Sequence, residues 1–386
     1  MYSITSYGAM IADRARISAY AEALRRAITS DSVVVDLGTG TGIFALLACR
    51  FGARRVYAIE PSDAIQVARE IAAANGFADR IEFRQAMSTE VTLPEPAHII
   101  VSDIGGVVPW FQSHLPSIAD ARRRFLAPGG VLIPQRDEVW AAVVEAPDLY
   151  ARHTAPWENC GFALDMEPAR RLAVNTFKKG EVTATQLMTE ARRWATVDYA
   201  QVDDANVQAL VRWTLSRAGT GHGIAVGLDR TLADGIGLSN APERSDAPDR
   251  DSIYATVFFP WSSAVPLAVA DTVEVELRAT LVGGDYTWCW NTSVLDARRP
   301  PGVKARFAQS TLSEMPLSPA TVRKASASYT PSLTENGRMA RFVLDAMSRG
   351  MPLGEIARGL SREFSTRRFG DQEALTFVAA LAQQYG

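Results

Sequence analysis

A glycine-rich segment and an acidic residue that follows it are the parts of this chain best suited to chemistry. The segment begins with Asp36 at the end of an apolar run and carries three glycines, Gly38, Gly40 and Gly42. Eighteen residues later, a second apolar run ends at Glu60. Glycines at the start of a helix let the backbone approach a ligand closely, and an acid that ends the next strand can bind two ribose hydroxyl groups. These residues therefore predict a site for a ligand that contains adenosine.

The glycine spacing and the acid before it favour S-adenosylmethionine over a dinucleotide as this ligand. The pattern is G-x-G-x-G from Gly38 to Gly42, whereas dinucleotide sites use G-x-G-x-x-G. A pyrophosphate binds best at a helix N-terminus without a negative charge nearby, and Asp36 places such a charge there. The cationic sulfonium and amino groups of S-adenosylmethionine suit that carboxylate. The alternatives are a dinucleotide site and a tight turn that binds no ligand.

The segments around these residues alternate between strand patterns and helix patterns. Helical periodicity appears at 14–28, 64–75 and 111–125. Apolar runs typical of buried strands lie between these segments and after them, at 33–37, 56–60, 81–83, 98–102 and 130–133. Alternation of this kind is typical of α/β proteins with a doubly wound parallel sheet. We expect a Rossmann-like domain over 1–134, with the helix at 14–28 immediately before the first strand.

The pattern changes after Pro134, where short alternating segments replace the strand-helix order. These segments lie at 139–144, 207–215, 253–259 and 272–281. They predict a mainly β, barrel-like domain over 135–317. Within it, the stretch 235–251 is rich in Pro, Ser, Asp and Gly and is predicted to be an exposed loop.

Composition and charge limit the classes of protein to which this chain can belong. Its 386 residues are too many for one typical core and indicate about two or three domains. A net charge of −3 gives no general attraction to nucleic acid or to an anionic membrane. Cys49, Cys160 and Cys289 lack metal-ligand spacing, and the N-terminus has no basic-then-apolar signal pattern. We expect a soluble cytoplasmic protein without a metal site.

Several motifs occur in one order and together resemble the protein arginine methyltransferases. In this chain they are 10–16 leading to Tyr20, 36–42, Glu60, 102–103 and 127–130. The resemblance covers about residues 7–300 and implies a class I S-adenosylmethionine-binding domain with a cap helix, followed by a β-barrel domain. It also implies a homodimer, with residues 157–200 supplying an arm that projects from the barrel.

The resemblance implies roles for individual residues in binding S-adenosylmethionine. Arg16 is expected to bind the methionine carboxylate, which a guanidinium matches in bidentate geometry; a solvated helix face is the alternative. Met10 is expected near the sulfonium, Glu60 on the ribose, and a residue among 88–90 on the adenine. The complete set of predicted cofactor-binding residues is Met10, Arg16, Asp36, Gly38, Thr39, Gly40, Gly42, Glu60, Pro61, Ser88, Thr89 and Asp103.

The chain departs from the family where the substrate arginine binds. The family holds the substrate guanidinium between two glutamates in the loop after the fourth strand, and here these positions carry Asp103 and Gln112. The Thr-His-Trp loop of the family falls on 251–253, so its histidine is missing, and Tyr7 occupies a further histidine position. A full guanidinium clamp is therefore not expected, while methyl transfer remains the predicted reaction.

Asp103, Gln112 and Tyr7 are the candidate catalytic residues. Displacement at a sulfonium methyl requires a lone pair held near the methyl in a water-poor site. Asp103 is expected to orient the nucleophile and accept its proton, Gln112 to add a neutral hydrogen bond, and Tyr7 to orient or cover the substrate. For Tyr7, and for Trp110 and Phe111 as lining of a substrate channel, packing in the core is the alternative.

Residues 318–386 are predicted to form a small helical, winged-helix-like domain. Three amphipathic patterns follow one another, at 337–348, 353–364 and 371–385. Their order resembles the peptide-chaperone domains of the pyrroloquinoline-quinone D type, which present leader peptides to modifying enzymes. A DNA-binding winged helix has the same helical pattern, but seven arginines and six acids over 332–386 argue against binding nucleic acid. The remaining alternative is an extension that only packs on the barrel or on a partner subunit.

Together these features predict a methyltransferase that uses S-adenosylmethionine to modify a side chain of a peptide or protein. A ribosomally made precursor peptide in natural-product biosynthesis, carried by the C-terminal domain, is one such substrate. The first alternative is a small-molecule N- or O-methyltransferase whose tail is structural. The second alternative is a cofactor-binding scaffold without catalysis, motivated by Gln112 and the missing histidine.

Overall fold

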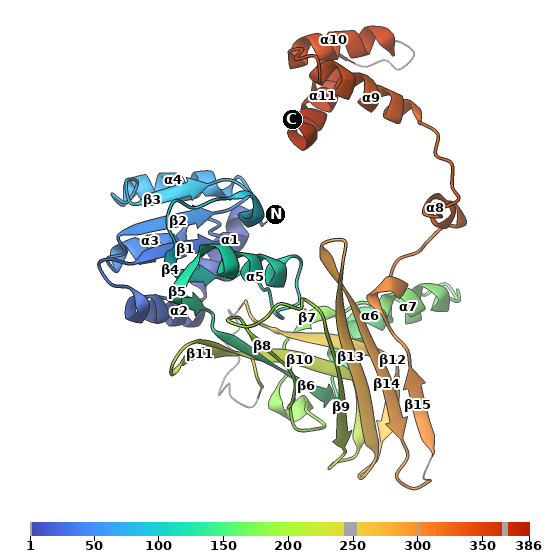
Figure 1. Cartoon of the computed structure of the whole chain (residues 1–386). Coiled ribbons are helices and arrows are strands. Elements are labelled where there is room, and N and C mark those ends of the chain that lie inside the picture. The colour runs from blue at the N-terminus through green and yellow to red at the C-terminus, as the bar shows by residue number, and fades with distance from the viewer. Residues whose placement is uncertain (1, 243–252, 300–301, 365–369) are drawn as a thin grey trace. The chain divides into compact units, whose positions relative to one another are not determined.

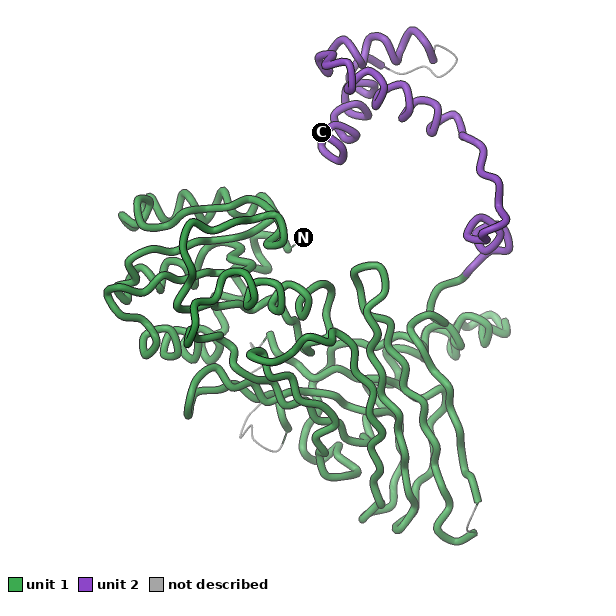
Figure 2. The backbone as a smooth tube through the Cα atoms, in the orientation of Figure 1, with its two compact units in different colours: residues 1–316 green, residues 317–386 purple. Residues whose placement is uncertain are grey.

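The computed structural model describes residues 2–242, 253–299, 302–364 and 370–386. The chain divides into two compact units, one up to Pro316 and one from Leu317 onward (Figure 2). Among the described residues, no helix is long and apolar enough to cross a membrane.

The N-terminal part of the first unit is a five-stranded parallel sheet in the order β3-β2-β1-β4-β5 (Figure 1). Its strands are β1 (Val33–Leu37), β2 (Arg55–Ile59), β3 (Ile81–Arg84), β4 (Ala97–Ser102) and β5 (Leu126–Ile133). Its helices are α1 (Ile4–Ala12), α2 (Arg14–Ala27), α3 (Ile43–Arg50), α4 (Ala64–Ala74), η1 (Ser88–Glu90) and α5 (His114–Phe125).

Alternate residues of each strand point to opposite faces of the sheet, and on β1 both sets include valines. Both faces of the sheet are therefore covered. Val33 and Val35 of β1 belong to the hydrophobic cluster that contains Leu115 of α5. Val34 belongs to a different cluster, together with Tyr20 of α2. All five residues of β1 are buried. The predicted Rossmann-like α/β fold is thus confirmed.

The strand order reverses between β1 and β4, which are neighbours in the sheet. In open α/β sheets, ligands bind outside the carboxyl ends of the strands at such a reversal. The segments that follow these two strands begin with Gly38 and Asp103. The topology therefore brings the glycine-rich loop and the candidate catalytic acid to the same edge of the sheet.

The rest of the first unit is mainly antiparallel, as predicted, and contains two sheets (Figure 1). One has the order β7-β12-β10-β6-β8 with β11 paired to β10, and the other has the order β15-β14-β13-β9. The strands are β6 (Arg136–Val144), β7 (Lys178–Gly180), β8 (Arg192–Asp198), β9 (Val207–Thr214), β10 (Gly219–Ala233), β11 (Ile236–Ser239), β12 (Thr256–Leu267), β13 (Thr272–Val282), β14 (Asp285–Leu295) and β15 (Val303–Phe307). The helical elements are α6 (Pro147–Glu158), α7 (Glu167–Ala173), η2 (Ala184–Gln186) and η3 (Thr311–Ser313).

The loop predicted over 235–251 is partly wrong. Strand β11 (Ile236–Ser239) pairs antiparallel with the end of β10, after a turn at Gly235 with a φ of 72°. Four residues are too few for a clear alternating pattern, so the turn-forming composition around them dominated the prediction. The remainder of that predicted loop, 243–251, lies outside the described residues.

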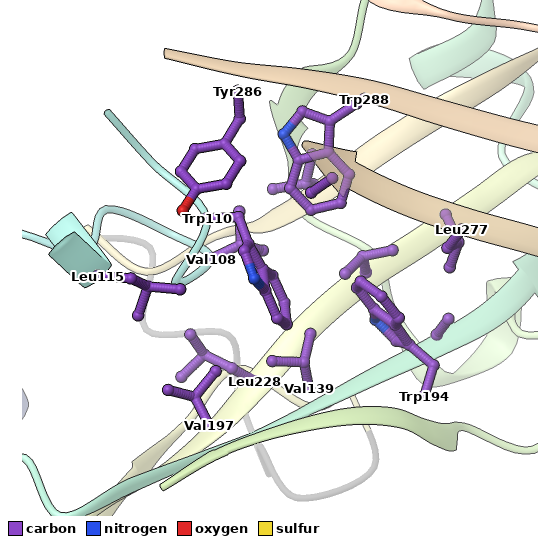
Figure 3. Close-up of a cluster of buried hydrophobic side chains, with 14 of the residues drawn as sticks. Val108, Trp110, Leu115, Val139, Trp194, Val197, Leu228, Leu277, Tyr286 and Trp288 are labelled. Atoms are coloured by element: carbon purple, nitrogen blue, oxygen red, sulfur yellow. The ribbon is translucent and has the colours of Figure 1, made fainter. Parts of the chain in front are cut away.

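Three tryptophans pack together within the core of the β part (Figure 3). Trp110 is 3% exposed, and its ring centroid lies 5.0 Å from that of Trp194 and 6.1 Å from that of Trp288. Trp110 comes from the loop before α5, whereas its two partners come from β8 and β14. This tryptophan therefore anchors the loop after β4 in the core, and a substrate-channel role does not fit its burial.

The second unit, described by itself, has its own small core. Its helices are α8 (Pro319–Lys324), α9 (Glu335–Met347), α10 (Leu353–Glu363) and α11 (Asp371–Tyr385). The core side chains come from the last three helices and are Met339, Val343, Ala346, Ile356, Ala357, Leu360, Ala374 and Val378. Thr334 caps α9 by accepting a hydrogen bond from the Gly337 amide.

Candidate active site

The glycine-rich loop connects β1 to α3 and is tightly packed. Gly38, Gly40 and Gly42 have φ values of 76°, 53° and 91°, a region that other residues rarely adopt. A Cβ atom on Gly40 would lie 2.5 Å from the ring of Tyr7, and one on Gly38 would lie 2.2 Å from Ile104. Both backbone conformation and packing therefore require glycine here.

Asp36 provides a buried carboxylate oxygen that has no partner. Its Oδ2 accepts hydrogen bonds from the Thr39 hydroxyl at 2.5 Å and the Ala45 amide at 2.9 Å. Its Oδ1 is buried and makes no hydrogen bond within the part of the chain that the structure describes. Burial raises the pKa of Asp36 to about 7, despite these two hydrogen bonds. Because an unpaired buried acceptor is costly, this oxygen suits a cationic donor on a ligand.

Glu60 lies directly after β2 and contacts the glycine-rich loop. Its Oε2 accepts a hydrogen bond from the Gly40 amide at 3.0 Å, and its Oε1 accepts one from the Ser62 amide at 2.9 Å. The side chain is thereby held at the carboxyl edge of the sheet, next to the segment after β1. An acid in this place can accept hydrogen bonds from ribose hydroxyls.

Arg16 extends from α2 across the same edge and is only 5% exposed. Its Nε donates to Asp103 Oδ2 at 2.6 Å, and its Nη1 donates to the Met10 carbonyl at 2.9 Å. Burial opposes its charge, but the Asp103 carboxylate outweighs burial and raises the pKa of Arg16. Its Nη2 makes no hydrogen bond to any described residue, so a guanidinium edge remains for an external carboxylate. The solvated helix face considered for Arg16 is therefore wrong.

The other predicted cofactor residues and the catalytic candidate Tyr7 differ in exposure. Met10 and Tyr7 lie on α1 and are partly buried. Burial, and after it the charge of Glu60, raises the pKa of Tyr7. Ser88 is 5% exposed at the start of η1, where its carbonyl accepts a hydrogen bond from Arg124 at 2.6 Å. By contrast, Pro61 and Thr89 are exposed.

Asp103 is surrounded by three donors, and the sequence analysis did not identify two of them, Arg230 and Tyr254. Its Oδ1 accepts hydrogen bonds from Arg230 Nη1, at 2.9 Å, and from the Tyr254 hydroxyl, while Oδ2 accepts from Arg16. Burial raises the pKa of Asp103, but the charges of Arg16 and Arg230 and the Tyr254 hydrogen bond outweigh it, so the pKa lies below its usual range. A carboxylate whose pKa is lowered is a weaker proton acceptor. Asp103 forms ion pairs with both guanidinium groups.

Arg230 also forms a buried ion pair with Asp137. The two residues face each other across the β10–β6 ladder, and Arg230 Nε and Nη2 each lie 2.8 Å from an Asp137 oxygen. Their side chains are 1% and 0% exposed. This bidentate geometry fixes the orientation of the Arg230 guanidinium toward Asp103.

His114 extends this network from the start of α5. The Tyr199 hydroxyl donates its only proton to Asp137 Oδ2 at 2.7 Å. The Tyr199 oxygen also lies 3.1 Å from His114 Nε2, so in this second hydrogen bond the imidazole N–H is the donor. His114 Nδ1 is then an acceptor, and it has no hydrogen-bond partner among the described residues. Burial and the charge of Arg230 lower the pKa of His114 to about 4.

The alternation of inward and outward residues along two strands could have identified Arg230 and Asp137 from the sequence. Leu228, Arg230 and Leu232 occupy successive buried positions along β10. Asp137 occupies the corresponding buried position two residues before Val139 on β6. A charge at an inward position of an alternating strand indicates a buried partner.

No hydrogen bond joins Gln112 to Asp103, both of which are described residues. Gln112 is exposed, has a φ of 44°, and makes no side-chain hydrogen bond to any residue that the structure describes. Of the segment aligned with the Thr-His-Trp loop, 251 and 252 lie outside the described residues. The Ile253 amide donates to Asp13 Oδ2 at 3.0 Å, so this segment reaches the N-terminus of α2.

Comparison with known proteins relates the first part of the chain to methyltransferases. A family model described as ribosomal protein L11 methyltransferase (PrmA) matches residues 19–150. Probable protein arginine N-methyltransferase 6 from Arabidopsis thaliana is 35% identical over 166 residues, which is 42% of this chain and 38% of that protein. Protein arginine N-methyltransferase 2 from Dictyostelium discoideum is 32% identical over 167 residues, which is 43% of this chain and 32% of that protein. The matches thus span well under half the length of these curated relatives.

Solved structures share the fold over most of the chain. The Trypanosoma brucei PRMT1 enzyme-prozyme heterotetrameric complex with AdoHcy matches with a TM-score of 0.69 and 20% identity, covering 79% of this chain and 96% of that one. Arabidopsis thaliana protein arginine methyltransferase 10 matches with the same TM-score and identity, covering 80% of this chain and 97% of that one. These neighbours confirm the predicted combination of a Rossmann-like sheet with a mainly β part.

Proposed function

We propose that this protein is an S-adenosylmethionine-dependent methyltransferase that modifies a side chain of a peptide or protein. The observation that carries the proposal is the buried Oδ1 of Asp36 beside the glycine-rich loop, for which the described residues provide no hydrogen-bond donor. The amino group of S-adenosylmethionine is a cation that can donate to this oxygen, while Arg16 Nη2 can donate to its carboxylate. Glu60 is assigned to the ribose and the buried Ser88 to the adenine.

When bound, this cofactor supplies a methyl group on a positively charged sulfur. The residues of the chain contribute binding, orientation and exclusion of water. Arg16, held by Asp103, orients the methionine end. Tyr7 packs against Gly40 and covers the loop. Both oxygens of Asp103 accept hydrogen bonds from Arg16, Arg230 and Tyr254, so we assign it a positioning role in place of the proton acceptor expected from the sequence.

The resemblance of the second unit to peptide-chaperone domains supports a role in recognising a precursor peptide. The unit has its own core, and Leu344, Leu353 and Leu375 on its helices are 36–40% exposed. These apolar side chains offer contacts for a helix or strand of a peptide. To test this role, methyl transfer to synthetic precursor peptides is compared between the wild type, Leu353→Ser, Leu375→Ser and the control Leu317→Ser, which lies outside these helices. A selective rise in peptide KM in the first two variants is expected, and equal KM values in all four would contradict the role.

A homodimer in which residues 157–200 supply the contacting arm follows from the resemblance to the protein arginine methyltransferases. Phe162 and Leu164, between these helices, are 82% and 63% exposed, and large exposed apolar side chains are typical of contact surfaces. Sedimentation velocity of the wild type and of Phe162→Ser/Leu164→Ser tests this assembly. A monomeric wild type would remove it.

Calorimetric titration with S-adenosylmethionine and, in parallel, with NAD tests the central proposal. The wild type, Arg16→Ala and Glu60→Ala are compared, with the exposed Arg14→Ala as the matched control. Micromolar binding of the methyl donor, weakened by the Arg16 and Glu60 changes and unaffected by the Arg14 change, is expected. Binding of NAD alone, or of neither ligand, would overturn the proposal. Cofactor binding without methyl transfer to any peptide, protein or small molecule would instead favour an inactive scaffold.

A further inference from the structure

The guanidinium of Arg230 occupies the position beside Asp103 where a positively charged substrate group would have to bind. Arg230 Nη1 lies 2.9 Å from Asp103 Oδ1 and 3.2 Å from the Tyr254 hydroxyl. The same Oδ1 accepts the Tyr254 proton, and Oδ2 accepts from Arg16 at 2.6 Å. Both oxygens of the acid are therefore already used by the protein itself.

The charges of this network balance without a substrate. Arg16 and Arg230 contribute two positive charges, and Asp103 and Asp137 contribute two negative charges. Asp13 lies nearby, and its oxygens accept hydrogen bonds from the Arg16 and Ile253 amides. A second cation on the Oδ1 side of Asp103 would lie beside the buried positive charge of Arg230, and the repulsion between the two charges is unfavourable.

Arg230 cannot readily leave this position. Asp137 holds it in a bidentate pair across the β10–β6 ladder, and Tyr199 donates to the same Asp137 carboxylate. Its side chain is 1% exposed, and its guanidinium carbon lies 5.4 Å from the centre of the Tyr254 ring. Rotating the guanidinium away would leave two buried carboxylates short of donors, which is costly.

We propose that Arg230 is a specificity-determining residue that restricts the methyl acceptor to a side chain without positive charge, and so excludes the arginine guanidinium. This inference rests on the proposed methyltransferase function. A neutral oxygen or nitrogen nucleophile forms the new bond to the methyl carbon with its lone pair. The carbon–sulfur bond breaks with its electron pair retained on sulfur, and the proton of the acceptor passes to water. Asp103 orients Arg16 and Arg230 throughout and accepts no proton.

Binding of two matched peptides tests this inference. One peptide carries arginine, and the other carries citrulline, the neutral isostere of arginine, at the same position. Each is titrated into the protein saturated with S-adenosylhomocysteine, after the affinity of S-adenosylhomocysteine itself has been measured. Failure to bind S-adenosylhomocysteine would reject the methyltransferase proposal. If S-adenosylhomocysteine does bind, the difference in affinity between the two peptides tests only the role of Arg230.

The variants are Arg230→Met/Asp137→Asn, which removes both charges of the buried pair and the Arg230 contact with Asp103 Oδ1, and Arg230→Lys, which keeps the positive charge. The wild type and Arg230→Lys are expected to bind the arginine peptide no more tightly than the citrulline peptide. Absence of binding to both peptides also agrees with this expectation. The double variant is expected to gain a preference for arginine of at least about tenfold, since hydrogen bonds to charged groups contribute this much. Near-ultraviolet circular dichroism and S-adenosylhomocysteine affinity verify its fold.

A wild type that prefers the arginine peptide by tenfold or more would overturn the inference. So would a folded double variant whose ratio of affinities equals that of the wild type. If the double variant does not fold, the comparison of the two peptides on the wild type and on Arg230→Lys decides, because a shared preference for arginine in both would contradict exclusion by the positive charge.

Discussion

Arg16 Nε and Asp103 Oδ2 lie 2.6 Å apart although the residues are 87 positions apart in the chain. The pair joins the start of α2 to the end of β4, and both side chains are 5% exposed. Because Asp103 holds one side of the guanidinium, the opposite edge is directed and available before any ligand arrives. The pair thus preorganises a carboxylate-binding group at the edge of the sheet.

Replacing Arg16 by lysine is expected to weaken binding of S-adenosylmethionine about tenfold to a hundredfold. An ammonium cannot bind Asp103 and a ligand carboxylate with the planar geometry of a guanidinium, and a charged hydrogen bond contributes about 1.5–3 kcal/mol. Calorimetric titration measures the effect, with the exposed Arg14→Lys as the control. Equal affinities for Arg16→Lys and the wild type would show that Arg16 does not bind the ligand.

Binding of S-adenosylmethionine is expected to release protons near pH 6. Burial raises the pKa of Asp36 to about 7 in the free protein, and a bound cation would favour its ionised form. Affinity should therefore rise as the pH increases through 7. Calorimetry in two buffers with different ionisation enthalpies measures the released protons.

Two substitutions distinguish Asp36 from other sources of these protons. Asp36→Asn should abolish the proton release and weaken binding. Thr39→Val keeps the carboxylate but removes a hydrogen bond that lowers its pKa, so the pH dependence should shift to higher pH. Identical proton release by the wild type and Asp36→Asn would contradict the assignment.

His114 is expected to make the protein less stable as the pH falls from 6.5 toward 4. Burial and the charge of Arg230 lower its pKa from 6.5 to about 4, so between these values the unfolded chain binds a proton that the folded chain does not. The free energy of unfolding then decreases with decreasing pH, by at most about 1.4 kcal/mol per pH unit for this group.

Urea denaturation of His114→Gln across this range measures that contribution. The variant should show a shallower loss of stability than the wild type. Tyr199→Phe, which removes the hydroxyl beside the imidazole but leaves the imidazole, should retain most of the pH dependence. A slope unchanged in His114→Gln would show that His114 is protonated in the folded protein as readily as in the unfolded chain.

Trp110→Ala is expected to lower the free energy of unfolding by about 3–5 kcal/mol, the range for truncating a buried large aromatic side chain. The side chain is 3% exposed and packs against Trp194 and Trp288. Tyr385→Ala, an aromatic truncation at a residue that is 60% exposed, is the control and should have little effect. Near-equal losses in the two variants would contradict the core role of Trp110.

Local patterns predicted the elements that bear the cofactor residues. Strand β1 was predicted over 33–37, where the structure has it, and the helix predicted over 14–28 corresponds to α2 (Arg14–Ala27). The period of apolar residues and the glycine turn act over a few neighbouring positions, so both can be read from the sequence. Strand β11 (Ile236–Ser239) was missed because it is short and its pairing depends on β10.

The parallel sheet, the glycine-rich loop and the acids at its edge can be predicted without a structure, because they follow from short-range periodicity and turn chemistry. The surroundings of Asp103 depend instead on contacts between distant parts of the chain. Arg230 is 127 residues away, and its guanidinium reaches this acid because β10 pairs with β6 and packs at the edge of the parallel sheet. Such a contact depends on strand register and packing between distant segments, which no local pattern specifies.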